Sequence, residues 1–269
     1  MRASWTSYAA GGALGLVMVA AVAAPWLAPY PPTDMGSDLL VPPSLGHLFG
    51  TDDLGRDIFS RVIYGASVSV LVGVISMGTA AILGVPLGLL SGYRGGLVDT
   101  ALMRVLDGLM AFPAILLAIA IMAVLGPSLQ NAMIAIGVIY IPSFARIVRA
   151  SVLSLREQEF VEAARGLGAA NARIVFRHIL PNCLSPVIVQ VSLGMGYAIL
   201  VEAALSFLGL GVQPPQASWG SMLAEGRGFL DSAPWFATFP GLAIFVTVLG
   251  LNFVGDRLRE ALDPRLRQL

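Results

Sequence analysis

The chain has 269 residues, of which 57% are hydrophobic and 12% are charged, and its formal net charge is zero. A soluble domain carries about 25% charged residues, so an ordinary soluble protein is excluded. All 16 basic residues are arginine, whereas a Walker A phosphate loop requires a lysine. The chain therefore cannot hydrolyse ATP by that route, and any such energy must come from another polypeptide.

Six membrane-spanning helices are predicted, because apolar runs about as long as the roughly twenty residues needed to cross a bilayer recur along the chain. The predicted spans cover about residues 9–27, 67–90, 99–125, 132–152, 186–208 and 235–254. The fold class is thus an all-α polytopic membrane protein. The first span is interpreted as an uncleaved helix rather than a signal peptide, because its apolar stretch is longer than a usual signal core.

Proline, glycine and aspartate are frequent at residues 30–61, where we expect an extended segment outside the membrane. Residues 1–65 then hold the first span and this segment, and residues 66–269 hold the other five spans. With the N-terminus inside, 13 of the 16 arginines are cytoplasmic, including Arg2 and four in the C-terminal tail. This distribution follows the positive-inside rule and predicts that both termini are cytoplasmic.

A charged segment interrupts the apolar pattern at residues 156–181. We expect a short helix at its start, on which Glu162 and Arg165 can pair at a spacing of three residues. Gly168 is placed to end that helix in the left-handed conformation. A second helix should follow and stop at Pro181. From chemistry alone the segment is either a binding knuckle for a partner or a solvated loop beside anionic membrane lipid.

The spacing Glu162-Ala-Ala-x-x-x-Gly168, followed by Leu180-Pro181, is similar to the EAA loop of ABC importer permeases. His178 stands where the broad motif usually has isoleucine. In that family the loop forms a cytoplasmic coupling helix in a groove of the ATPase subunit. The resemblance implies that ATP and Mg are bound by partner subunits and that this chain holds no cofactor. The residues implied in ATPase coupling are Glu162, Ala163, Ala164, Arg165, Gly168, Leu180 and Pro181.

Two further runs resemble the dipeptide/oligopeptide/nickel permease family: GTDDLGRD at 50–57 and EAALSFLGLGV at 202–212, the latter followed by SWG at 218–220. The arrangement is similar to the C-type second permease subunit over essentially the whole length. It implies a type I ABC importer permease fold in a bacterial inner membrane, with 66–269 as the permease core and a coupling loop at about 153–182.

The resemblance also implies the transported substrate and the partners. Peptides of the dipeptide or oligopeptide class are expected, and nickel or glutathione are the alternatives. The expected partners are a second homologous permease, two ATP-binding subunits, an extracytoplasmic substrate-binding protein and membrane lipid. No nucleic-acid partner is expected.

Two acidic residues within the spans are candidates for a substrate path or gate. Asp107 is three residues from Arg104, so an intrahelical pair is the simplest account, and a path role is the alternative. Glu202 is either an anchor between helices or a polar lining of the path, and the sequence does not separate these readings.

The polar segments outside the spans suggest structural roles. Asp52, Asp53, Arg56 and Asp57 are interpreted as a charge-paired turn rather than a cation site, because the spacing lacks a calcium-loop pattern. Trp219 is expected to anchor a small outer helix at the membrane interface. No metal site is expected, since the single cysteine and the two separated histidines offer no ligand set.

Two other classes of protein were considered. An ion-gradient-driven secondary transporter should carry carboxylates deep in several spans, whereas here Asp107 and Glu202 are the candidates. A membrane enzyme has little support, because no nucleophile–base cluster and no HExxH motif occurs in the sequence.

Overall fold

The computed structural model describes residues 5–262, and this part of the chain is helical without any strand. Arg2, Arg265 and Arg267, which were counted toward the cytoplasmic side, lie outside these residues. The helices are α1 (Trp5–Leu27), α2 (Ile58–Arg94), α3 (Gly96–Met110), α4 (Ala114–Leu125), α5 (Leu129–Leu155), α6 (Glu159–Gly166), α7 (Asn171–Arg173), the π-helix η1 (Ile174–Ile179), α8 (Leu180–Phe207), α9 (Trp219–Gly226), the 3-10 helix η2 (Arg227–Phe229) and α10 (Trp235–Leu262).

By length and apolar composition, four helical segments of the described residues can cross a membrane: α2, α5, α10 and the continuous run 171–207. The pair α3 and α4 makes a fifth if it is one bent span. The 23-residue apolar helix α1 corresponds to the remaining predicted span. The prediction of an all-α polytopic membrane protein is therefore confirmed.

The third predicted span is not one straight helix. Helices α3 and α4 meet at an angle of 88° across residues 111–113. Pro113 stands at the N-cap of α4, and a proline disfavours the helical conformation of the residue before it. The chain therefore turns sharply where the hydropathy pattern predicts continuity.

The prediction that Pro181 stops the second helix of the charged segment is wrong. Residues 171–207 form one continuous helical run that passes through Pro181. Directly before the proline the hydrogen-bond spacing widens to that of a π-helix, and the amide of Leu180 bonds to the carbonyl of Val175 five residues back. Proline near the start of a regular α-helical stretch is tolerated, because its missing amide hydrogen is least needed there.

The most extensive helix contact is that between α2 and α5. Gly84, Gly88 and Gly92 recur every four residues on α2 and face α5. A Cβ on Gly88 would lie 2.8 Å from the Cβ of Val148, so only glycine permits this approach. Small residues at this spacing let membrane helices pack with their backbones close together.

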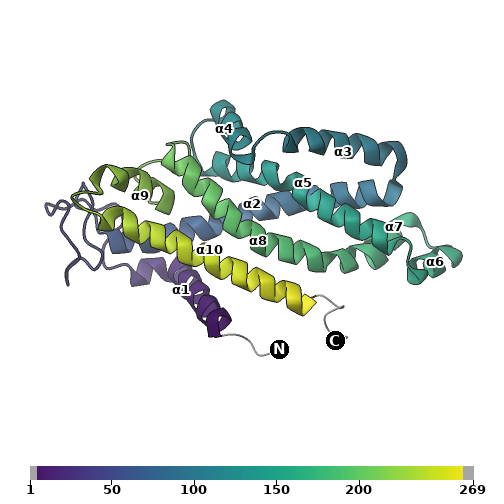
Figure 1. Cartoon of the computed structure of the whole chain (residues 1–269), viewed down its shortest axis with the longest axis horizontal. Helices are drawn as coiled ribbons and strands as arrows, with labels where there is room; N and C mark the ends of the chain where they lie inside the picture. Colours follow the sequence, from purple (N-terminus) through teal and green to yellow (C-terminus); the bar gives the residue numbers. More distant parts are fainter. Residues whose placement is uncertain (1–4, 263–269) are drawn as a thin grey trace.

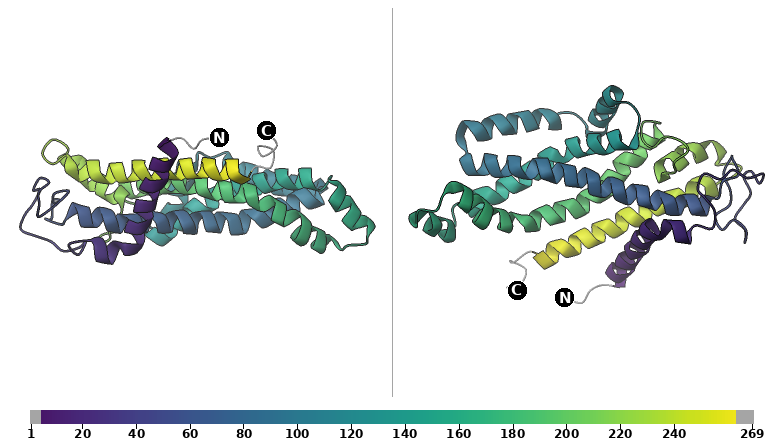
Figure 2. Two further views of the ribbon diagram at one scale, coloured as in Figure 1. Left: turned by 90° about the horizontal axis from the view of Figure 1, so that it is seen from below. Right: turned by 180° about the vertical axis from the view of Figure 1, so that it is seen from behind.

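Figure 1 shows an elongated bundle with α6 at one end and α9, together with the segment between α1 and α2, at the other. Helix α1 contacts both α2 and α10, and the view from below in Figure 2 shows it crossing α10 steeply. The larger apolar cluster joins α2, α4, α5 and α8 and continues into α6. The two ends of the bundle therefore present different sets of exposed residues.

Candidate functional site

Helix α6 has one face anchored in the bundle and one face exposed. Val161 is fully buried and Ala164 is 9% exposed, and both belong to the larger apolar cluster. Glu162, Ala163 and Arg165, which lie between and beside these anchors, are exposed. Because side chains three apart share a face of a helix, the sequence EAAR at 162–165 separates an inward surface from an outward one. Figure 1 shows α6 projecting at one end of the bundle.

Gly168 ends α6 as predicted, with a φ of 78°. The amide of Ala169 bonds to the carbonyl of Ala164, and the amide of Gly168 bonds to that of Arg165, at 3.1 and 2.9 Å. These two bonds form a Schellman motif, in which the glycine position requires a left-handed backbone. A Cβ at Gly168 would meet nothing within 4 Å, so the requirement for glycine is one of conformation and not of space.

The predicted pair of Glu162 with Arg165 is absent from the ion pairs of the described residues. The guanidinium of Arg165 instead lies over the ring of Tyr93, 5.9 Å from its centroid. Tyr93 in turn donates a hydrogen bond of 2.8 Å to the side chain of Asn171. A cation–π contact between Arg165 and Tyr93 of α2 therefore takes the place of the ion pair expected within α6.

Leu180 and Pro181, at the far end of the resembling motif, lie at the start of α8. Leu180 packs against the apolar cluster that also holds Val161 and Ala164. Pro181 is exposed. The structure therefore connects the two ends of the motif through shared packing.

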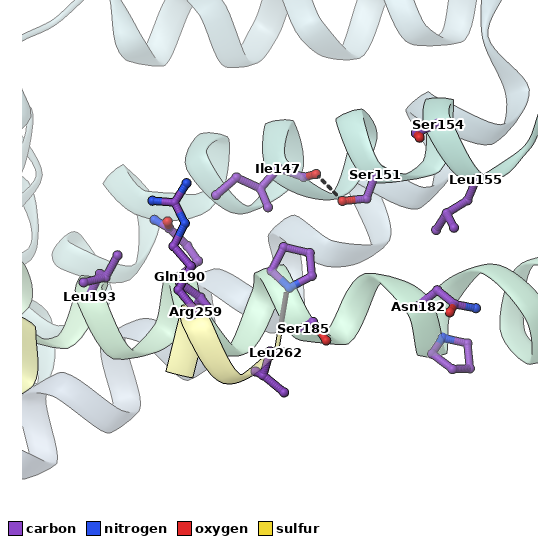
Figure 3. A pocket seen from close by; sticks show the side chains of 13 residues that line it. Ile147, Ser151, Ser154, Leu155, Asn182, Ser185, Gln190, Leu193, Arg259 and Leu262 are labelled. Carbon is purple, nitrogen blue, oxygen red and sulfur yellow. Dashed lines mark hydrogen bonds between the residues drawn. The ribbon is translucent and has the colours of Figure 1, made fainter. Parts of the chain in front are cut away.

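A groove of about 690 Å³ lies between α5, α8 and the end of α10. Figure 3 shows the side chains that line it. The polar members are Ser151, Ser154, Asn182, Ser185, Gln190 and Arg259. The apolar pattern of the sequence does not predict this groove, because its walls come from three helices that are not consecutive. Helices α6, α7 and η1 lie between α5 and α8, and α9 and η2 lie between α8 and α10.

The opposite end of the bundle holds a cluster of buried charges. Arg56 donates to Asp52 at 2.6 Å and to Glu225 at 3.0 Å. Arg61, which is fully buried, donates to the same oxygen of Glu225 at 3.0 Å and lies 3.4 Å from Asp52. Carboxylate oxygens of Asp52, Asp53 and Glu225 lie within 4.8 Å of one another, and each of the three carboxylates lies within 3.8 Å of an arginine. The charge-paired turn is confirmed, and its partner on α9 was not anticipated.

Two further contacts complete this end of the molecule. Asp57 caps α2 by accepting from the amide of Ser60, and its Oδ1 accepts a hydrogen bond of 2.9 Å from Nδ1 of His47. Burial raises the pKa of Glu225, and Arg61 and Arg56 act in the opposite direction.

Glu202 is fully buried, where α8 meets α9. Its Oε1 accepts a hydrogen bond of 2.6 Å from Ser206, whose hydroxyl oxygen accepts from the amide of Val212. Gly220 of α9 approaches so closely that a Cβ there would lie 2.9 Å from that of Ser206. The printed bond of Glu202 thus lies within α8 and not between two spans, and Ser206 connects its carboxylate to the loop that follows α8.

Trp219 begins α9, so the predicted small helix exists. Its side chain is 1% exposed and its indole donates to the carbonyl of Val62 at 2.9 Å, so the anchor is to the protein and not to lipid headgroups. Gly65 lies against the same ring. Trp219 therefore fastens α9 to α2.

Asp107 does not pair with Arg104 as predicted. Its carboxylate accepts from Arg146 of α5. Eight residues earlier on α3, Asp99 accepts two bonds of 2.6 Å from Arg149, also of α5. The two pairs hold α3 against α5, which a rule about neighbours on one helix could not anticipate.

Comparison with known proteins places this arrangement in a family. Residues 84–268 match the model of the binding-protein-dependent transport system inner membrane component. The dipeptide transport system permease protein DppC of Alkalihalophilus pseudofirmus is 55% identical over 231 residues, covering 86% of this chain and 76% of that protein. The glutathione transport system permease protein GsiD of Escherichia coli is 49% identical over 254 residues, covering 94% and 84%.

Another relative spans nearly the whole chain. The di/tripeptide transport system permease protein DppC of Pseudomonas aeruginosa is 44% identical over 281 aligned positions, which cover 99% of this chain and 93% of that protein. Among solved structures, the inward-facing MetNI methionine ABC transporter matches with a TM-score of 0.61 at 19% identity, over 76% of this chain and 96% of that one. The structural match supports the type I permease fold.

The fold and the relatives define a permease subunit of an ABC importer. The chain belongs to the family of binding-protein-dependent transport system inner membrane components. It is a multi-pass membrane protein and a transport subunit rather than an enzyme, and such a permease works with ATPase and substrate-binding partners. Membership of this family sets aside the secondary-transporter alternative.

Proposed function

We propose that this chain is one of two related permease subunits of an ATP-driven importer that carries peptides of the dipeptide class. Relatives that are 55% and 44% identical to this chain are named for dipeptide and di/tripeptide transport. In the proposed assembly the second permease is a different chain, two ATP-binding subunits bind ATP and Mg, and an external binding protein delivers the peptide. The complex lies in the bacterial inner membrane.

The exposed face of α6 is proposed to couple the permease to the ATPase, and its anchored geometry is the observation that carries this proposal. Glu162, Ala163 and Arg165 face outward, while Val161 and Ala164 are fixed in the core. Leu167, 88% exposed beside the glycine turn, adds an apolar contact. A displacement of α6 by the ATPase would therefore also displace α5 and α8, because the inward face of α6 is packed in the core.

The energetic requirement is that ATP binding favours one arrangement of the spans over the other. A ligand shifts such an equilibrium only through a difference in its affinity for the two states. We propose that closure of the ATPase pair moves α6 of each permease and rocks the spans from inward-open to outward-open. This assignment places α6 in the cytoplasm and the end with α9 outside, where the binding protein docks.

Glu202 and Asp107 are better assigned to structural roles than to the substrate path. We propose that Glu202, through Ser206, holds the end of α8 to the loop that follows and that Asp107 holds α3 against α5, because both carboxylates have partners within the fold. The groove between α5, α8 and α10 is the better candidate for contact with the substrate.

Substitution of Gly168 tests the coupling role. Valine at Gly168 would have to adopt a φ of 78°, which costs a side chain with a Cβ roughly 1–2 kcal/mol or distorts the turn. We expect the Gly168→Val importer to hydrolyse ATP without a matching rate of peptide uptake. The ratio of ATP hydrolysed to peptide transported, measured in proteoliposomes, reports the effect.

Gly166→Val is the matched control, because Gly166 is helical, has no positive φ and also has open space around its Cβ position. It adds the same side chain two residues away, and its ratio should stay close to that of the native importer. Normal coupling in Gly168→Val would count against the role of α6.

Glutathione is the second candidate substrate, because a relative named for glutathione transport is 49% identical over 94% of this chain. Uptake of a labelled dipeptide in the presence of excess glutathione, dipeptide or nickel chelate separates the candidates. Glutathione should compete poorly if the dipeptide assignment is right.

A further inference from the structure

We propose that the groove between α5, α8 and α10 is the inner part of the peptide path, and that Arg259 binds the C-terminal carboxylate of the peptide there. This inference rests on the proposed function and extends it to a particular residue and a particular group on the substrate. The argument begins from the polarity of the groove.

Polar side chains from two spanning helices face this groove. Ser151 and Ser154 come from α5, and Asn182, Ser185 and Gln190 come from α8. Gln190 lies within the fifth predicted span, residues 186–208, near its inner end. Polar side chains at such depth face protein or water and avoid hydrocarbon. The groove is therefore unsuited to lipid tails and suited to an aqueous path.

The size of the groove fits a small peptide. Its volume of about 690 Å³ lies within the range of roughly 300–1,000 Å³ that is typical of small-molecule sites. Hydroxyl and amide side chains can exchange hydrogen bonds with a peptide backbone of any sequence, because each of them both donates and accepts. Such a lining suits a carrier that accepts many different side chains.

Among the residues that the structure describes, Arg259 is the one ionisable residue that lines the groove. Figure 3 shows its side chain extending from the end of α10 toward α5, in the part of the groove that Gln190 also lines. The nearby Glu260 pairs with Arg257 at 2.7 Å, and among residues 5–262 no acidic side chain lines the groove that Arg259 faces. A guanidinium in this setting favours a carboxylate, with which it can form two parallel hydrogen bonds.

The position of the groove links it to the coupling helix. Its walls are the last turns of α5 and the first turns of α8, and α6 lies between these two segments in the chain. Pro181, at the start of α8, lines the groove as well. Movement of α6 would shift both walls, so the grip on a peptide carboxylate would change with the state of the ATPase.

The first experiment measures uptake of labelled alanyl-alanine by the complete importer in proteoliposomes. In Arg259→Gln we expect uptake at limiting peptide to fall roughly tenfold, which is the effect of losing one charge-assisted hydrogen bond. Uptake by Arg259→Lys should lie between those of the native importer and Arg259→Gln, because the charge remains but the two parallel hydrogen bonds of the guanidinium are lost. Arg257→Gln is the matched control on the same helix, and its uptake should be unchanged.

A second experiment removes the selection made by the binding protein. The permease–ATPase complex in nanodiscs, without binding protein, is examined by saturation-transfer NMR with alanyl-alanine and with its C-terminal amide. The free carboxylate should bind more tightly, and Arg259→Gln should remove that preference.

Three results would overturn the inference. The first is equal uptake by Arg259→Gln and Arg257→Gln, and the second is no preference for the carboxylate in the native complex. The third is loss of the second permease from the purified Arg259→Gln complex, because the groove would then be a contact between the two permeases. A native importer that takes up no peptide would instead refute the proposed function itself, so the two failures can be told apart.

Discussion

At the scale of single residues, the buried Arg61 links two carboxylates that lie far apart in the chain. Asp52 and Glu225 both lie within 3.4 Å of its guanidinium. Arg61→Met leaves these carboxylates without that partner, and breaking a buried pair in this way costs about 3–5 kcal/mol. We expect the purified complex to unfold at a lower temperature, and tryptophan fluorescence measures this unfolding.

Asp53→Asn provides the comparison at the same cluster. Asp53 is 35% exposed and lies 3.8 Å from Arg56, so its pairing contributes less than about 1 kcal/mol. If both substitutions lower the unfolding temperature equally, the buried network does not hold α9 in place.

At the scale of helices, the contact between α2 and α5 depends on the absence of a side chain at Gly88. A methyl group there would meet the carbonyl oxygen of Ala145 and the Cβ of Val148. Overpacking of this kind costs about 1–3 kcal/mol, so Gly88→Ala should lower both thermal stability and transport. Thermal unfolding of the purified complex and peptide uptake measure the two effects.

Gly78 lies on the same helix and has nothing within 4 Å of its Cβ position. Gly78→Ala therefore adds the same methyl group without a clash and should be neutral or slightly stabilising. Destabilisation of both variants by the same amount would contradict the role given to the glycine stripe.

At the scale of the whole molecule, the proposed orientation places the two ends of the bundle on opposite sides of the membrane. Cys183, the single native cysteine, is buried, so a thiol introduced at an exposed position can be labelled selectively. We expect a membrane-impermeant thiol reagent to label Leu45→Cys in intact cells, because Leu45 is 100% exposed in the outer segment.

Leu167→Cys, at the turn after α6, should react with the same reagent only after the membrane is opened. The measurement uses cells that express the permeases without the ATPase subunits, because the proposed contact with the ATPase would cover Leu167, which is 88% exposed in this chain. Failure to react in intact cells then reflects its side of the membrane and not burial. The reverse labelling pattern would overturn the proposed orientation.

Local features of the sequence predicted local structure well. The apolar runs placed the helices, and the glycine at 168 marked a left-handed helix end that the structure contains. Both are properties of neighbouring residues, because span length depends on consecutive hydropathy and a Schellman turn on a few adjacent backbone groups. The glycine spacing on α2 was equally visible, although its partner helix was not.

Contacts between distant segments followed no local rule. Arg61 and Glu225 are 164 residues apart, and Asp107 pairs with Arg146 instead of with Arg104 on its own helix. Pro181, expected to end a helix, lies inside one because a π-helical turn precedes it. By itself the sequence determined the class of protein, the spans and the turn after α6, since these depend on short stretches of chain. Only the tertiary structure decided which charges pair and which polar residues share a groove, because those choices depend on which helices lie side by side.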